Sequence, residues 1–146
     1  MSLDPEDEVP PLGFLLVRIA EDVDRRFVAA LGELGLRPRE LRTLVLVDRH
    51  PGLSQRELAR RLDVDPGNLV ALLDGLDRAG LLTRRRDEAD RRRRTLRLTA
   101  GGARLLARAN RATAAVEDVV FGALTESERA ALSGMALRVW RAGRGE

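Results

Sequence analysis

The stretch SQRELARRLDVDPGNLVALLDGL, residues 54–76, contains the start signals of two short helices with a tight turn between them. Ser54 and Glu57 form a capping box, in which the serine hydroxyl and the glutamate carboxylate satisfy free N–H groups at a helix start. Asp65 followed by Pro66 begins the second helix, because aspartate caps free N–H groups and proline fits the first helical position. Leucines recur at helical spacing in both segments. The stretch therefore predicts a helix-turn-helix.

A hairpin with a charged tip is expected directly after this motif. Residues 81–86 and 93–98 are short extended runs, in which Leu96 and Leu98 share one face and Arg97 points the other way. Residues 84–97 contain eight arginines and three acidic residues. A helix pair followed by a basic hairpin is the order of a winged helix-turn-helix. In that fold the second helix enters the major groove of DNA, and hairpin arginines reach phosphates or the minor groove.

The segments that flank this region are predicted to be long helices. Apolar residues recur at steps of three or four within residues 12–34, 100–124 and 126–141. In the last helix an apolar stripe is expected to face inward; its residues are Leu132, Met135, Ala136, Val139 and Trp140. The fold class is mainly α with a small β-hairpin, a winged helix-turn-helix core flanked by long helices.

Composition excludes several classes of function. Cysteine is absent, which excludes disulfides and thiolate metal sites and fits a cytoplasmic protein. His50, the single histidine, has no evident nucleophile or carboxylate partner, and no glycine-rich loop precedes a helix after a strand. The sequence therefore predicts no enzyme, no metal site and no cofactor. No apolar run is long enough to cross a membrane.

The chain resembles the MarR (multiple antibiotic resistance regulator) family of transcription factors. The resemblance rests on residues 51–59, 62–65 and 72–81. It is most specific at residues 87–92 and 98–102, which resemble the family's Asp-x-Arg wing tip and its Leu-Thr-x-x-Gly entry to the next helix. It implies an obligate homodimer, joined through the first helix and the last two, that binds a pseudo-palindromic operator in double-stranded DNA. Trp140 is expected in the core or in the dimer interface.

The resemblance also implies a domain organisation. Residues 1–36 are interpreted as an N-terminal leader and dimerisation helix, 37–99 as the DNA-binding lobe, and 100–146 as C-terminal dimerisation helices, all in one integrated domain. At Asp63 the family commonly has a glycine. A positive φ is therefore expected there, and aspartate tolerates it better than most residues.

The recognition helix departs from the family pattern. Residues 65–77 contain no arginine, and with the arginine that follows the helix has a net charge of −2. Asn68 is the only amide there that can read a base, most naturally adenine, and apolar side chains are left to contact thymine methyl groups. DNA affinity is therefore expected to depend on the wing and on Arg56, Arg60 and Arg61.

The candidate DNA-contacting residues come from three places. They are Ser54, Gln55 and Arg56 in the first helix; Pro66, Gly67, Asn68, Val70 and Ala71 in the second; and Arg84, Arg86, Asp90, Arg91, Arg92, Arg93 and Arg94 in the hairpin. At the tip, Asp90 is expected to hold Arg92 through a charge-assisted pair and so to orient it.

The expected function is that of a transcriptional regulator, most often a repressor in this family, released by a small aromatic or anionic effector. The effector is expected to bind between the dimerisation helices and the DNA-binding lobe, with Arg18, Arg42 and His50 as candidates. A structural or solvent-exposed role for His50 is the alternative. The alternative function is a dimeric adaptor of the same fold, with weak or lost DNA binding, that acts through protein contacts.

Overall fold

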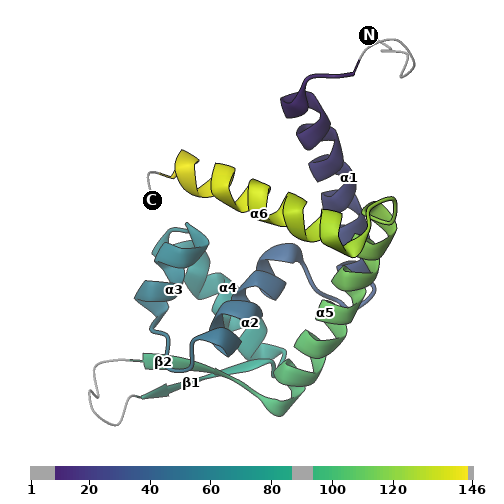
Figure 1. The fold of residues 1–146 in the computed structure, drawn as a ribbon. Helices are drawn as coiled ribbons and strands as arrows, with labels where there is room; N and C mark the ends of the chain where they lie inside the picture. Colours follow the sequence, from purple (N-terminus) through teal and green to yellow (C-terminus); the bar gives the residue numbers. More distant parts are fainter. Residues whose placement is uncertain (1–8, 87–93, 145–146) are drawn as a thin grey trace. The chain divides into compact units, whose positions relative to one another are not determined.

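The computed structural model describes residues 9–86 and 94–144, which form six helices and two strands. The elements in chain order (Figure 1) are α1 (Leu12–Gly32), α2 (Pro38–Arg49), α3 (Gln55–Leu62), α4 (Pro66–Arg78), β1 (Leu82–Arg86), β2 (Arg94–Leu98), α5 (Ala100–Val120) and α6 (Glu126–Gly143). The chain divides into two compact units. We call Arg25–Thr113 the central unit, and Met1–Asp24 with Ala114–Glu146 the terminal unit.

The helix starts and the tight turn form where the local sequence predicts them. Ser54 and Glu57 make the expected capping box: the Ser54 backbone N–H donates to the Glu57 carboxylate over 2.9 Å, and the Glu57 N–H donates to the Ser54 hydroxyl over 3.3 Å. Asp63, after α3, has φ of +53°, as expected. The Val64 N–H donates to the Ala59 carbonyl over 3.1 Å. This bond closes the end of α3 and fixes the turn into α4.

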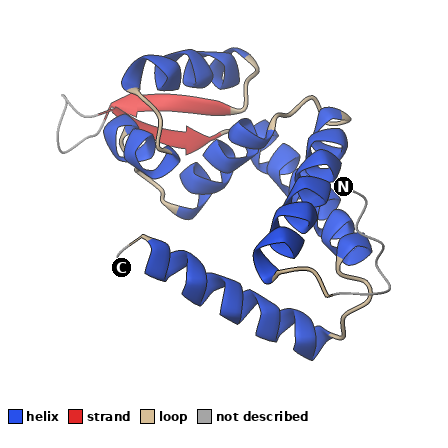
Figure 2. Ribbon diagram, turned by 90° about the horizontal axis from the view of Figure 1, so that it is seen from above, coloured by secondary structure: helices blue, strands red, loops and turns tan. Residues whose placement is uncertain are grey.

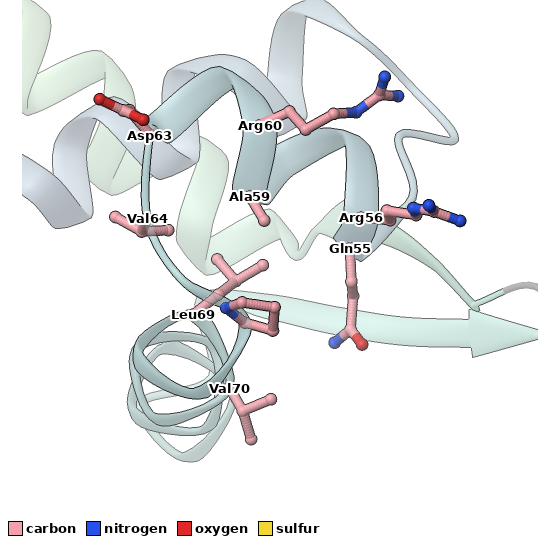
Figure 3. Close-up of a pocket in the computed structure, with 9 residues that line it drawn as sticks. Gln55, Arg56, Ala59, Arg60, Asp63, Val64, Leu69 and Val70 are labelled. Carbon is pink, nitrogen blue, oxygen red and sulfur yellow. The ribbon is translucent and has the colours of Figure 1, made fainter.

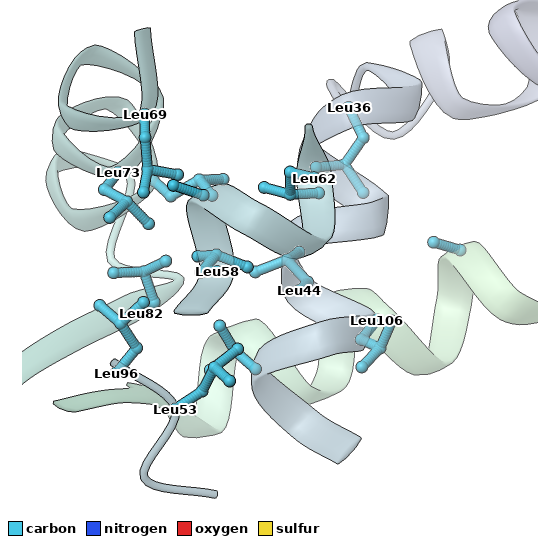
Figure 4. Packing of buried hydrophobic residues seen from close by; sticks show 14 of the residues in the cluster. Leu36, Leu44, Leu53, Leu58, Leu62, Leu69, Leu73, Leu82, Leu96 and Leu106 are labelled. Carbon is cyan, nitrogen blue, oxygen red and sulfur yellow. The ribbon is translucent and has the colours of Figure 1, made fainter. Parts of the chain in front are cut away.

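The core of the central unit is built from leucines (Figure 4). They come from α2, α3, α4, both strands and α5, and the most completely buried include Leu44, Leu58, Leu73, Leu82 and Leu96. Burial of a leucine side chain contributes about 1.5–3 kcal/mol. The buried faces of α3 and α4 hold these helices against the hairpin, and their other faces are left toward solvent.

The hairpin is a small antiparallel sheet (Figure 2) in which Leu82 pairs with Leu98 and Arg84 pairs with Leu96. A further antiparallel bridge joins Ser54 to Thr95, and the Leu96 N–H donates to the Leu53 carbonyl over 3.2 Å. The segment that leads into α3 therefore covers one edge of β2. This contact ties the wing to the first helix of the helix-turn-helix.

The entry into α5 explains the Leu-Thr-x-x-Gly pattern. The Thr99 hydroxyl donates to the Gly80 carbonyl over 2.6 Å and accepts from the Gly102 N–H over 2.9 Å. A Cβ on Gly102 would lie 1.9 Å from the Leu81 carbonyl oxygen. Only glycine therefore fits where α5 begins against the segment that follows α4.

In the terminal unit, the prediction of an inward-facing stripe on the last helix is wrong for the single chain. Of that stripe, Leu132 is half-buried, whereas Met135, Val139 and Trp140 are 49%, 72% and 57% exposed. The chain itself buries no residue of α6. Apolar periodicity identifies the face but does not say what covers it. Among the described residues, no helix is long and apolar enough to span a membrane.

Candidate nucleic-acid interface

Helices α3 and α4 border an open hollow of about 780 Å³ in the central unit (Figure 3). Gln55, at the start of α3, points toward α4, and Val70 of α4 lies below it. Arg56 and Arg60 leave α3 on one side, one turn apart. The hollow thus joins an apolar floor, which includes Pro66 and Val70, to a cationic side. This combination suits a surface that meets bases and phosphates together.

The N-terminal half of α4 is open to solvent. All five residues that the sequence singled out here are exposed: Pro66, Gly67, Asn68, Val70 and Ala71. On the same helix Leu69, Leu73 and Leu76 are buried. The helix therefore holds the core with one face and presents its candidate base contacts on another. The exposed half is neutral and carries one amide and one large apolar side chain.

Asp65 caps α4 and also binds the one amide in it. The backbone N–H of Asn68 donates to Asp65 Oδ1 over 3.1 Å, and this hydrogen bond holds the pKa of Asp65 below its usual value. The side-chain amide of Asn68 donates to the other carboxylate oxygen, Asp65 Oδ2. Because a carboxylate accepts and does not donate, the Asn68 amide nitrogen must face Asp65 and its carbonyl oxygen must face away. The interaction fixes the orientation of the amide.

The arginines of β1, the first strand of the wing, differ in their surroundings. Arg84, a candidate DNA contact, forms an ion pair with Asp74 of α4, with 2.5 Å between Arg84 Nη2 and Asp74 Oδ1. Arg86 is exposed. Arg85 and Arg97 were not among the DNA-contacting residues predicted from the sequence. They are exposed on the hairpin face opposite Arg84. Successive side chains of a strand point to opposite faces, and this alternation is the sequence signal that identifies both residues.

The tip of the wing lies outside the described residues. Four candidate contacts fall there, namely Asp90, Arg91, Arg92 and Arg93, and the expected Asp90–Arg92 pair stays a prediction. Arg94 begins β2 opposite Arg86.

Two of the three candidate effector residues come together around Arg61. Arg42 donates to the Arg61 carbonyl over 3.0 Å, and Arg61 Nη1 lies 2.8 Å from His50 Nε2. Arginine can only donate, so His50 Nε2 is the acceptor in this contact. Arg18, in the terminal unit, pairs with Glu21 over 2.8 Å. The described residues include no group of three or more histidine, cysteine or acidic side chains able to hold a metal ion.

Charge is strongly divided between the two units. The central unit holds 21 arginines and 11 acidic residues, a net charge of +10, whereas the terminal unit holds 5 arginines and 12 acidic residues, a net charge of −7. The overall charge of +3 conceals this division. A polyanion is therefore attracted to the unit that contains the helix-turn-helix and repelled by the other.

Known proteins resemble this chain over most of its length. A family profile described as MarR family matches residues 34–93. An HTH-type transcriptional repressor, Rv2887 of Mycobacterium tuberculosis, is 34% identical over 119 residues, which are 82% of this chain and 86% of that protein.

Solved structures show the same fold. The transcriptional repressor CouR, bound to a 23-mer DNA duplex, is 34% identical with a TM-score of 0.81, and the match covers 97% of this chain and 100% of that one. The M. tuberculosis MarR family protein Rv2887 in complex with DNA is 30% identical with a TM-score of 0.75, over 90% of this chain and 98% of that one. Wild-type MarR from E. coli, in its apo form, is 26% identical with a TM-score of 0.75, and the match covers 90% of this chain and 98% of that one.

Proposed function

The chain belongs to the MarR family of transcriptional regulators, and we propose that it binds duplex DNA as a homodimer and represses transcription. The division of charge is the observation that carries this proposal. A net charge of +10 on the central unit supplies the phosphate attraction that dominates DNA affinity. The adaptor alternative needs no such concentration of arginine on the unit with the helix-turn-helix.

In this proposal α4 lies in the major groove with its exposed N-terminal half toward the bases. Arg56 and Arg60 of α3 lie beside it and contact phosphates, together with Arg85 or Arg86 of the wing. Phosphate contacts set affinity and orientation, whereas base contacts set specificity. Asn68 is the candidate reader of adenine, and Val70 the candidate contact for a thymine methyl group.

Dimerisation is supported by apolar surface that the chain does not cover. In the terminal unit α1 and α6 border an apolar groove of about 340 Å³ that contains Leu16, Ile19 and Leu132. Leu16 is 46% exposed and Trp140 is 57% exposed. Large exposed apolar patches on soluble proteins mark interaction sites. A second copy with the same faces would cover it through a two-fold interface.

Two recognition helices related by a two-fold axis read half-sites about one helical turn, roughly 34 Å, apart. A 23-mer such as the one bound by CouR is long enough for two such half-sites. We also propose that an aromatic or anionic effector releases the DNA, with Arg42 and His50 as candidate contacts beside Arg61. The effector is expected to favour a dimer whose recognition helices no longer match the half-sites.

The test is a salt titration of DNA binding. Fluorescence anisotropy with a duplex that the protein itself selects from a random library is expected to give saturable binding. Its logarithmic affinity should fall linearly with the logarithm of salt concentration. Sedimentation should give twice the chain mass of 16.1 kDa. Substitution of both Arg85 and Arg86 by alanine should flatten the salt dependence, and substitution of Glu33, an exposed acidic residue, by glutamine should not. Absence of DNA binding at low salt would favour the adaptor.

A further inference from the structure

The ion pair between Arg84 and Asp74 joins the recognition helix to the first strand of the wing. The Arg84 side chain is 20% exposed and that of Asp74 is 46% exposed. Arg84 stands opposite Leu96 in the hairpin, and Leu96 is fully buried. The side chain of Arg84 therefore starts on the core face of the wing and reaches α4 from there.

The surroundings of Arg84 favour this pair over a phosphate contact. Its Nε is buried and has no hydrogen-bond partner among the described residues. A guanidinium largely removed from water needs its counter-charge, because an uncompensated charge in that position is strongly unfavourable. To reach a phosphate, Arg84 would have to leave both Asp74 and the core face.

We propose that Arg84 is a positioning residue for DNA recognition, and that its pair with Asp74 fixes the rotation of α4 about its own axis. This inference rests on the proposed function, in which α4 reads the major groove. Gly67, Val70, Ala71 and Asp74 occupy positions i, i+3, i+4 and i+7, so they share one face of the helix. The ion pair therefore holds the face that presents three of the five candidate base contacts of α4.

The geometry of a helix determines how far a rotation of α4 about its axis displaces its side chains. Side-chain tips lie about 5–6 Å from the helix axis, so a rotation of about 10° moves them by about 1 Å. Binding contacts need placement within about 0.5 Å. Leu69, Leu73 and Leu76 hold α4 against the core, but apolar contact is non-directional. A directional ion pair is the contact that selects one rotation.

The proposal and a direct phosphate contact predict opposite signs for Asp74→Asn. If Arg84 positions α4 through Asp74, this substitution weakens binding to the selected duplex by about tenfold, as for the loss of a hydrogen bond to a charged group. If Arg84 binds phosphate, the substitution frees Arg84, removes a negative charge and strengthens binding. Asp77→Asn is the matched control, because Asp77 is an exposed acid on the same helix with no ion pair among the described contacts. It should leave binding unchanged or strengthen it slightly.

The salt dependence of Arg84→Gln gives a second, independent readout. Loss of one phosphate contact in each protomer would reduce the slope of logarithmic affinity against logarithmic salt concentration by about two. Loss of positioning weakens binding but leaves the slope unchanged. In a double-mutant cycle, Asp74→Asn should add little to Arg84→Gln, because both remove the same pair. If Asp74→Asn fails to fold, the salt slope of Arg84→Gln alone decides between positioning and phosphate contact.

The outcomes separate this inference from the proposed function. If the wild-type protein binds no duplex at low salt, the proposed function fails. If it binds, but Asp74→Asn binds as tightly as Asp77→Asn, or Arg84→Gln flattens the salt dependence, the positioning role is overturned. Circular dichroism at the temperature of the binding assay checks that each variant is folded.

Discussion

Gly102→Ala tests the junction between the helix-turn-helix and α5. A Cβ at this position would lie 1.9 Å from the Leu81 carbonyl oxygen and 2.9 Å from the Leu81 carbonyl carbon. Real Cβ atoms stay at least 3.0 Å from such atoms, so α5 and Leu81 must separate by about 1 Å. The same carbonyl accepts from the Thr99 N–H over 3.1 Å. A shift of that size would lengthen or break this hydrogen bond.

The expected change in the free energy of unfolding of Gly102→Ala is the sum of three contributions. Forced overpacking costs about 1–3 kcal/mol, and the lost backbone hydrogen bond about 1 kcal/mol. Alanine in place of glycine returns up to about 1 kcal/mol through helix propensity. We expect Gly102→Ala to lower the free energy of unfolding by about 1–3 kcal/mol, which lowers Tm by about 3–10 °C for a chain of this length.

Gly101→Ala is the matched control. Its Cβ would meet the Gly80 carbonyl oxygen at 3.5 Å and the Thr99 hydroxyl at 3.6 Å, which is ordinary van der Waals contact. It should therefore leave Tm unchanged or raise it slightly. Thermal unfolding followed by circular dichroism, at one protein concentration because dimerisation contributes to stability, compares the two variants. Equal Tm values for the two would refute the steric argument.

Three further predictions concern specificity, pH and assembly. Asn68→Ala should remove a preference for adenine at one position of each half-site, worth about 1–3 kcal/mol; selection of duplexes from a random library measures it, and an unchanged consensus would contradict it. The lowered pKa of Asp65 means that its carboxylate stabilises the fold above its unfolded pKa of about 3.9, and that this contribution is lost as pH falls through the folded value. Asp65→Ser, which caps without titrating, should therefore lose less stability than wild type in urea unfolding between pH 5 and pH 3. Leu16→Glu places a charge in the apolar groove of the terminal unit, so sedimentation should show monomers where the wild type is a dimer.

Features set by neighbours in the chain could be predicted from the sequence, and features set by distant partners could not. The capping box at Ser54 and the positive φ at Asp63 each depend on a few adjacent residues, and both formed as expected. The Asp65–Asn68 interaction is also local, at a spacing of three, and was open to prediction. The Arg84–Asp74 pair was not, because it requires β1 to pack on α4 in one register.

The exposure of α6 shows a second limit of the sequence. Its apolar positions repeat at helical spacing, and that spacing is the same whether the stripe packs on its own chain or on another copy. Met135 was therefore assigned correctly to an apolar face and wrongly to the core, whereas for Trp140 the core is contradicted and the dimer interface stays a prediction. Only the area left uncovered distinguishes the two cases, and that quantity requires the folded structure.

The structure also resolves why a recognition helix with a net charge of −2 suits a DNA-binding protein. Asp65 receives two hydrogen bonds from Asn68, and Asp74 is paired with Arg84. Two of the three acidic residues thus have partners within the protein. Asp77 lies in the last turn of α4, away from the exposed N-terminal half. Arg84 therefore offsets the charge of Asp74, whereas Asp65 keeps its charge and directs it at the N–H groups of Asn68. The two partnered carboxylates orient the amide and the helix. Substitution of either one should then weaken specific binding, although it makes the helix less acidic.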